Sequence, residues 1–239
     1  MTINIDVYKL KELNLCGATV IDGFSSPSRI SSIVANYLIN SLELEQVSIL
    51  DSDDFPAVSM IYGSEPKYPA GIFADEEKKM VVFLSEFSPQ PQLVRPIANT
   101  ILSWAAENRC SRIIAAEALA SPEGQSPKEH RMFGVGSVDG ARRVLKELHI
   151  EQLRNGYITG VPAMLLNSGM RENFKVICLL AEVQANGGML DAMAAAKVIE
   201  TIAKLHPNVE IDVGPLYEEA AKIEGLVNEQ QQSQSLMFG

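Results

Sequence analysis

The sequence is poor in cysteine, and its cysteines form no recognisable framework. Cys16, Cys110 and Cys178 are an odd number of thiols scattered over 239 residues, with neither a zinc-ligand spacing nor a disulfide pattern. This excludes a small disulfide-stapled domain and is typical of a reducing compartment. Cys178 lies within the apolar run 176–180, and we interpret it as a buried thiol. We therefore expect no metal site.

Residues typical of catalysis and of cofactor binding are also few. The three histidines, His130, His149 and His206, are not accompanied by a Gly-x-Ser-x-Gly elbow. The glycine-rich stretch at 134–140 places its third glycine one position late for a dinucleotide fingerprint, so a turn is the better interpretation. We expect no cofactor, and a non-enzymatic role is favoured over an enzyme.

Basic residues are in the minority, with 20 lysines and arginines against 30 aspartates and glutamates, for a formal net charge of −10. Nucleic acids and anionic membranes select a basic face, so neither is expected as a partner. No apolar run approaches the roughly 18 residues of a membrane-spanning helix. Residues 1–6 contain no basic segment followed by an apolar core, which a signal peptide would show. We expect a cytoplasmic protein.

Apolar residues are abundant, at 46% of the chain, and they occur in short runs that alternate with helical patterns. Such alternation is typical of an α/β fold with a largely parallel sheet. We predict one α/β domain over residues 1–224, then the end of the last helix and a polar tail over 225–239. Prolines and glycine disfavour regular structure at 63–69, and residues 119–131 are predicted to form a surface loop. The predicted strands are 18–23, 47–50, 58–62, 80–84, 113–116, 133–138 and 176–181. The predicted helices are 28–42, 93–108, 140–148, 190–205 and 215–229, and a further apolar helix is predicted to follow residues 160–162.

Three glutamates stand at or just beyond the ends of predicted strands. Glu86 comes after the strand at 80–84, Glu117 after the strand at 113–116, and Glu182 after the strand at 176–181. If these strands are parallel, the three side chains lie at the carboxyl edge of the sheet, where open α/β folds place ligands. Paired carboxylates there could divide the roles of acid and base. The alternative is that these glutamates point into solvent or cap neighbouring helices.

The turn after the first predicted strand contains Ser25, Ser26 and Ser28 around Pro27. A small-residue loop that opens a helix presents backbone N–H groups, which can bind a phosphate or a carboxylate. The same serines and proline are also ordinary residues for the start of a helix. The sequence leaves both an anion site and plain capping open.

The last ten residues change character abruptly. A stretch of glutamine and serine at 230–235 is followed by Leu236, Met237, Phe238 and Gly239. A polar, low-complexity stretch is typical of a flexible tether, and the apolar residues after it could contact a partner. The alternative is a frayed end that packs on its own or a neighbouring subunit.

The order of motifs in the second half of the chain resembles the archaeal proteasome-assembly-chaperone family, relatives of the second eukaryotic proteasome assembly chaperone. The resemblance is carried by residues 156–166 (GYITGVPAMLL), 176–182 (VICLLAE), 191–197 (DAMAAAK) and 214–220 (GPLYEEA). It implies a three-layer α/β sandwich with a mostly parallel central sheet, similar to nucleoside phosphorylases. It also implies a homo-oligomer, and a chaperone or adaptor that binds proteasome α subunits or the core particle.

The resemblance gives the end of the chain a specific interpretation. Proteasome-binding factors often end in a hydrophobic residue, a tyrosine and any last residue, and Met237, Phe238 and Gly239 look like a variant with phenylalanine in the tyrosine position. The variant lacks one hydroxyl, and a lost hydrogen bond costs about 0.5–1.5 kcal/mol. The competing hypothesis is a phosphorylase- or hydrolase-like enzyme, or a small-molecule binder, that uses Glu86, Glu117 and Glu182.

Overall fold

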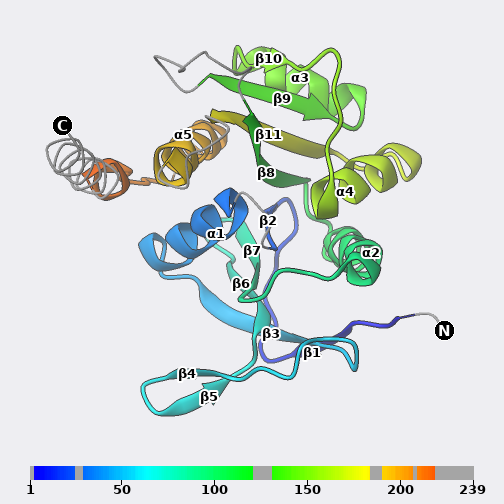
Figure 1. Cartoon of the computed structure of the whole chain (residues 1–239), viewed down its shortest axis with the longest axis vertical. Coiled ribbons are helices and arrows are strands. Elements are labelled where there is room, and N and C mark those ends of the chain that lie inside the picture. Colours follow the sequence, from blue (N-terminus) through cyan, green and yellow to red (C-terminus); the bar gives the residue numbers. More distant parts are fainter. Residues whose placement is uncertain (1–2, 25–28, 121–130, 184–189, 207–208, 219–239) are drawn as a thin grey trace, which may run out of the picture.

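The chain is arranged in three layers in the computed structural model, which describes residues 3–24, 29–120, 131–183, 190–206 and 209–218. A twisted central sheet lies between two layers of helices (Figure 1). One face is covered by α2 (Pro91–Glu107) and α4 (Gly160–Arg171). The other is covered by α1 (Ile30–Ser41), α3 (Asp139–Glu147) and α5 (Leu190–Leu205). The predicted α/β sandwich is confirmed.

The main sheet is parallel at its centre and antiparallel toward its margins. Within the described residues its strand order is β1-β3-β6-β7-β2-β8-β11-β9-β10. The four central strands β7, β2, β8 and β11 run parallel, whereas β1, β3 and β6 pair antiparallel, as β9 does with β11. The strand bounds are Asp6–Lys9 (β1), Thr19–Gly23 (β2), Glu45–Asp51 (β3), Ala70–Asp75 (β6), Met80–Ser85 (β7), Arg112–Ala120 (β8), Met132–Gly136 (β9), Glu151–Gln152 (β10) and Val176–Val183 (β11).

Successive hydrophobic side chains of each central strand pack on opposite faces of the sheet, one under α2 and α4 and the next under α1, α3 and α5. Every residue of β7 is buried, because Val81 and Phe83 point toward α2 while Met80 and Val82 point toward α1. This is why its sequence is one continuous apolar run rather than an alternating one.

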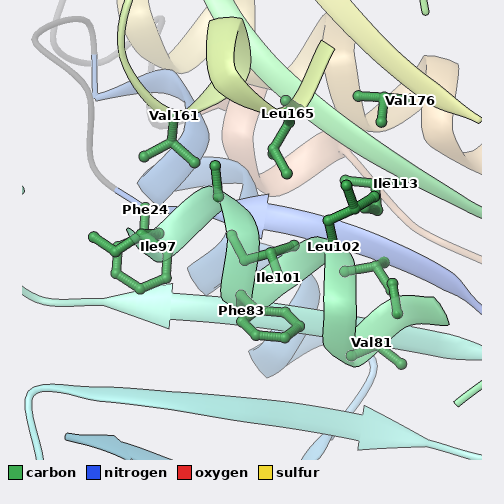
Figure 2. Packing of buried hydrophobic residues seen from close by; sticks show 14 of the residues in the cluster. Phe24, Val81, Phe83, Ile97, Ile101, Leu102, Ile113, Val161, Leu165 and Val176 are labelled. Carbon is green, nitrogen blue, oxygen red and sulfur yellow. The ribbon is translucent and has the colours of Figure 1, made fainter. Parts of the chain in front are cut away.

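Aromatic and aliphatic side chains interlock in the layer under α2. Figure 2 shows Ile97 and Ile101 of α2 beside Phe83, with Leu165 of α4 next to them. The ring of Trp104 meets that of Phe83 edge to face, with 5.3 Å between centroids. Such pairs contribute about 0.5–1.5 kcal/mol beyond their area burial.

Most predicted elements are present, with shifted ends. The structure adds β1, β6 and β10, which the sequence analysis did not identify, and it extends β8 to Ala120. The helix predicted at 215–229 begins at Gly214 and is described only as far as Glu218. The rest of that helix, the tail at 225–239 and most of the loop predicted at 119–131 lie outside the described residues.

The prediction that residues 63–69 lack regular structure was wrong. They contribute β5 (Glu65–Lys67), which pairs antiparallel with β4 (Met60–Tyr62) in a separate two-stranded hairpin. Gly63 and Ser64 form the turn with φ of 57° and 70°. A two-residue hairpin of type I′ requires positive φ at both central positions. The glycine that argued against regular structure is therefore what makes the hairpin.

Gly23, at the end of β2, is where α1 approaches the sheet most closely. A Cβ atom at this position would lie 2.3 Å from the Cβ of Ala35 in α1 and 2.4 Å from the carbonyl oxygen of Phe83 in β7. Both neighbours are part of rigid elements, so neither can move aside without shifting a helix or a strand.

We predict that Gly23→Ala lowers the free energy of unfolding by about 1–3 kcal/mol or more, because it overpacks this contact. Gly140→Ala is the matched control. Its added Cβ would meet only the flexible end of the Lys175 side chain. Gly140 lies in helix α3, where alanine is preferred to glycine by about 1 kcal/mol. Chemical denaturation of the two variants checks this. Equal stabilities would contradict the close approach at Gly23.

Candidate functional site

The carboxyl ends of the parallel strands bring one carboxylate into the interior. Asp22 lies near the end of β2 and is fully buried. It pairs in register with Ala115 of β8, and Ala115 pairs in turn with Cys178 of β11. Strand alternation puts the side chains of Asp22 and Cys178 on the face covered by α2 and α4, among apolar residues.

Asp22 is incompletely satisfied. Its Oδ1 accepts a hydrogen bond from the backbone N–H of Phe24 at 3.1 Å, while its Oδ2 is buried and has no hydrogen-bond partner among the described residues. Burial raises the pKa of this carboxyl to about 7, with the hydrogen bond from Phe24 acting in the opposite direction and the charge of Glu117 adding to the rise. Near neutral pH this side chain can hold a proton, and so can donate as well as accept a hydrogen bond.

Cys178 is a buried thiol, as the sequence predicted. Its side chain is fully inaccessible, and burial, with smaller contributions from the charges of Glu117 and Asp22, raises the pKa of the thiol far above its ordinary value. A thiol is a weak nucleophile unless it is ionised. This residue therefore adds packing rather than covalent chemistry.

The three glutamates expected at one edge divide between two faces of the sheet. Glu117 lies within β8 and Glu182 within β11, and their alternation with Ala115 and Cys178 puts both on the α2 and α4 face. Glu86, just beyond β7, lines a cleft on the α1 face. The structure thus brings Asp22 and Glu117 near each other and places Glu86 elsewhere.

The strands that carry Glu117 and Glu182 also extend further than predicted. The strand predicted at 113–116 stops before Glu117, but β8 and β11 continue pairing beyond it, with Ala118 opposite Ala181 and Leu119 opposite Glu182. Asp22 itself was missed. The available signal was an acidic residue inside the apolar run 18–23, where strand propensity alone gives it no reason to be.

Two groups of predicted site residues lie outside the described residues. These are Ser25, Ser26 and Ser28 in the turn after β2, and Met237, Phe238 and Gly239 in the tail. Within the described part of the chain no group of three or more histidines, cysteines, aspartates and glutamates could hold a metal ion. No helix of that part is long and apolar enough to cross a bilayer.

A second candidate site is a projecting surface that the sequence analysis did not identify. Residues 58–68, which we call the arm, contain β4 and β5 and extend away from the body at the lower end of Figure 1. Of the nine large apolar residues exposed in the described part of the chain, four lie on the arm: Val58 (49% exposed), Ile61 (65%), Tyr62 (56%) and Tyr68 (52%). Such a concentration is typical of an interaction surface, which makes the arm a candidate.

The arm overhangs a cleft of about 400 Å³, which we call the arm cleft. Met60 and Tyr62 line it from the arm, and Ile39 of α1, Phe73 of β6 and Leu84 of β7 line it from the body. Polar side chains, including that of Glu86, also line it. A largely apolar cleft with a few polar groups is typical of a binding site.

The buried carboxyl of Asp22 gives a prediction for stability against pH. Its pKa is about 7 in the folded chain, against 3.8 for the ordinary group. Between these two pH values the folded state keeps a proton that the unfolded state has lost. The free energy of unfolding therefore falls as pH rises from about 4, and the loss due to this group reaches its full size above about pH 7.

Asp22→Asn removes that titration. We expect the free energy of unfolding of Asp22→Asn, relative to the unsubstituted chain, to rise by about 2–3 kcal/mol between pH 5 and pH 8. Asp139→Asn is the control, because Asp139 is exposed and the hydrogen bond it accepts from Arg142 lowers its pKa. The free energy of unfolding of this variant, relative to the unsubstituted chain, should therefore not change between pH 5 and pH 8. Denaturation curves at several pH values test this, and parallel profiles for Asp22→Asn would contradict it.

Solved structures share this architecture over nearly the whole chain. PbaA from Pyrococcus furiosus, described as an archaeal homolog of proteasome-assembly chaperone, superposes with a TM-score of 0.84 at 22% identity, covering 98% of this chain and 94% of that one. PbaB from the same organism, described as an archaeal proteasome activator, gives a TM-score of 0.80 at 20% identity, over 97% and 100% of the two chains. A protein of unknown function from Thermoplasma acidophilum gives 0.71 at 24% identity, over 93% and 92%.

These likenesses are similarities of fold, because each pair is less than 25% identical. A search of curated proteins found no match. The model of the PAC2 family, however, matches residues 20–231, a span that includes most of β2 with the buried carboxyl of Asp22, the arm and every helix described above. The chain therefore belongs to the PAC2 family.

Proposed function

We propose that this protein is a non-enzymatic chaperone or adaptor in the cytoplasm that binds proteasome α subunits or the core particle. The observation that carries the proposal is the near-complete superposition on PbaA and PbaB, which are described as a proteasome-assembly-chaperone homolog and a proteasome activator. Membership of the PAC2 family supports the same role. The burial of Cys178 and the splitting of the glutamates give no support to a catalytic centre.

We also propose that the protein associates with itself. The four exposed apolar residues of the arm support this part of the proposal, because large apolar patches on a soluble protein are usually covered by a partner. Self-association would present several copies of any proteasome-binding element at once, and this raises apparent affinity without new contacts.

The contact with the proteasome is proposed to include Met237, Phe238 and Gly239. Support comes from the sequence alone: an apolar group follows a polar stretch that can act as a tether. Phenylalanine at 238 supplies aromatic packing but no hydroxyl, so we expect moderate rather than tight docking.

An alternative proposal, binding of a small molecule, rests on a different observation. The Oδ2 of Asp22 is buried without a hydrogen-bond partner among the described residues, and Glu117 lies nearby. A small ligand with a hydrogen-bond donor could satisfy that oxygen. The structure does not favour a cleft shared by all three glutamates, because Glu86 lies on the opposite face of the sheet from Glu117 and Glu182.

The proposed function is tested by capture of purified proteasome α subunits and of the assembled core particle on immobilised protein. A chain lacking residues 237–239 is compared with one lacking Gln230, Gln231 and Gln232, which shortens the tail equally but keeps its apolar end. We expect binding by the full chain and the control, and loss of binding without 237–239. Binding that survives both deletions would move the contact to the body, and no binding by the full chain would overturn the proposal.

Phe238→Tyr is expected to strengthen binding to the proteasome, whereas the deletion weakens it. Restoring the hydroxyl should strengthen binding by about threefold to tenfold, the equivalent of one hydrogen bond of about 0.5–1.5 kcal/mol. Phe238→Leu keeps an apolar side chain but removes the ring, and should weaken binding. Biolayer interferometry on the core particle measures both, and equal affinities for the three chains would exclude an aromatic contact at this position.

A further inference from the structure

The arm carries apolar side chains on both of its faces. Ile61 is paired with Pro66, whereas Met60 is paired with Lys67 and Tyr62 with Glu65. Successive residues of a strand point to opposite faces, so Ile61 and Pro66 share one face and Met60 and Tyr62 share the other. Since Met60 and Tyr62 line the arm cleft, Ile61 and Pro66 face away from the body. A strand pair that met only water on its far side would carry polar residues there.

The arm is also too small to be stable by itself. β4 and β5 have three residues each and form a sheet separate from the main one. A two-stranded hairpin is at best marginally stable in water and usually needs a third strand or a packed layer. Within the described residues of a single chain nothing packs on the far face of the arm, where the Ile61 side chain is 65% exposed.

Charge favours a second copy of this chain as the partner. The chain as a whole has a net charge of −10, so two copies repel each other over most of their surface. The arm is an exception, because Glu65 and Lys67 are its only charged residues and they form an ion pair at 3.2 Å. Two copies can therefore meet at this neutral, apolar element with the least electrostatic cost. A strongly charged partner would find little to pair with there.

We propose that two copies of this chain exchange arms, with the arm of each copy occupying the arm cleft of the other. In this arrangement the far face of one arm, Ile61 and Pro66, packs on the α1 side of the partner's body, and the two cleft-facing surfaces, with Met60 and Tyr62, meet each other. Both faces of the arm are then buried. The contact is isologous, because the same residues serve on each copy, and it closes as a dimer with twofold symmetry.

The available area is sufficient for such a contact. A fully buried tyrosine removes about 150–250 Å² from water, so the half-exposed Tyr62 and Tyr68 each offer about 100 Å². With Ile61 and Val58 added, the arm supplies about half of the ~800 Å² that each partner gives to a stable interface. The walls of the arm cleft, which include Ile39 and Leu84, are available for the remainder.

This inference rests on the self-association in the proposed function and names its surface. It is tested first by the mass of the full chain in solution, measured by size-exclusion chromatography with light scattering. Ile61→Asp places a charge on the far face of the arm. At the same protein concentration, the measured mass of this variant should be half that of the unsubstituted chain or less. Tyr157→Asp is the control, since Tyr157 is 90% exposed and precedes α4, which covers the face of the sheet opposite the arm cleft, and the mass of this variant should equal that of the unsubstituted chain.

A cross-linking experiment distinguishes arm exchange from other arm-mediated contacts. Cys16 is exposed, whereas Cys110 and Cys178 are buried, so Cys16→Ser provides a background without an accessible thiol. One chain carries Ile61→Cys and a differently tagged chain carries Asn40→Cys, a position on α1 that lines the arm cleft. Because Ile61 points away from the cleft of its own chain, a disulfide between these positions forms between two copies.

We expect the mixed chains to form a disulfide-linked dimer under mild oxidation, and a mixture of Tyr157→Cys with Asn40→Cys to form none. An oligomer that is unaffected by Ile61→Asp and gives no specific cross-link would overturn arm exchange while leaving self-association intact. A monomeric full chain would overturn both, while the separate capture assay would still decide proteasome binding. A monomer whose proteasome binding is lost on Ile61→Asp would assign the arm to the proteasome instead.

Discussion

Four parallel strands at the centre of the sheet are covered by helices on both faces, and this double burial decides where polar side chains can lie. Neither face of β7 or β2 is available to water, so a charge can be placed there only with a shifted pKa or a partner. Asp22 is the side chain on which this constraint falls most heavily. Its unsatisfied oxygen is a local cost to the fold, and residues kept at a cost are commonly functional.

The same constraint limits how helices approach the sheet. At the end of β2 a glycine replaces any larger residue, because α1 and the carbonyl of Phe83 leave no room for a Cβ atom. The close contact holds the middle of α1, at Ala35, against the carboxyl end of β2. Packing at Gly23 and the burial of Asp22 one residue earlier are therefore parts of one arrangement.

Much of the fold could be predicted from the sequence, because the central strands are continuous apolar runs and α2 and α5 have strong helical patterns. β6 was missed because it contains glycine and alanine and ends at a charged turn, and β1 because all four of its residues are exposed. Single-sequence patterns register burial, so an exposed edge strand leaves little signal.

The candidate sites were harder to predict, for a related reason. Strand ends in the sequence place the three glutamates at one edge of the sheet but do not say which face each occupies, since a shift of one position reverses the face. Glu86 was separated from Glu117 in this way. The arm was hidden because Gly63, Pro66 and Pro69 normally signal a loop, whereas here Gly63 makes a tight turn and Pro66 occupies a strand position opposite Ile61.

The strand order has a consequence for how the chain is made. β8 pairs with β2 on one side and β11 on the other, and 63 residues separate the end of β8 at Ala120 from the end of β11 at Val183. At roughly 5–20 residues per second of synthesis, the nascent β8 waits about 3–13 s for its second neighbour. During that interval an apolar strand edge at the centre of the future sheet is open to other chains. Nascent chains of this protein therefore pass through a stage in which the centre of the sheet can pair with another chain and aggregate.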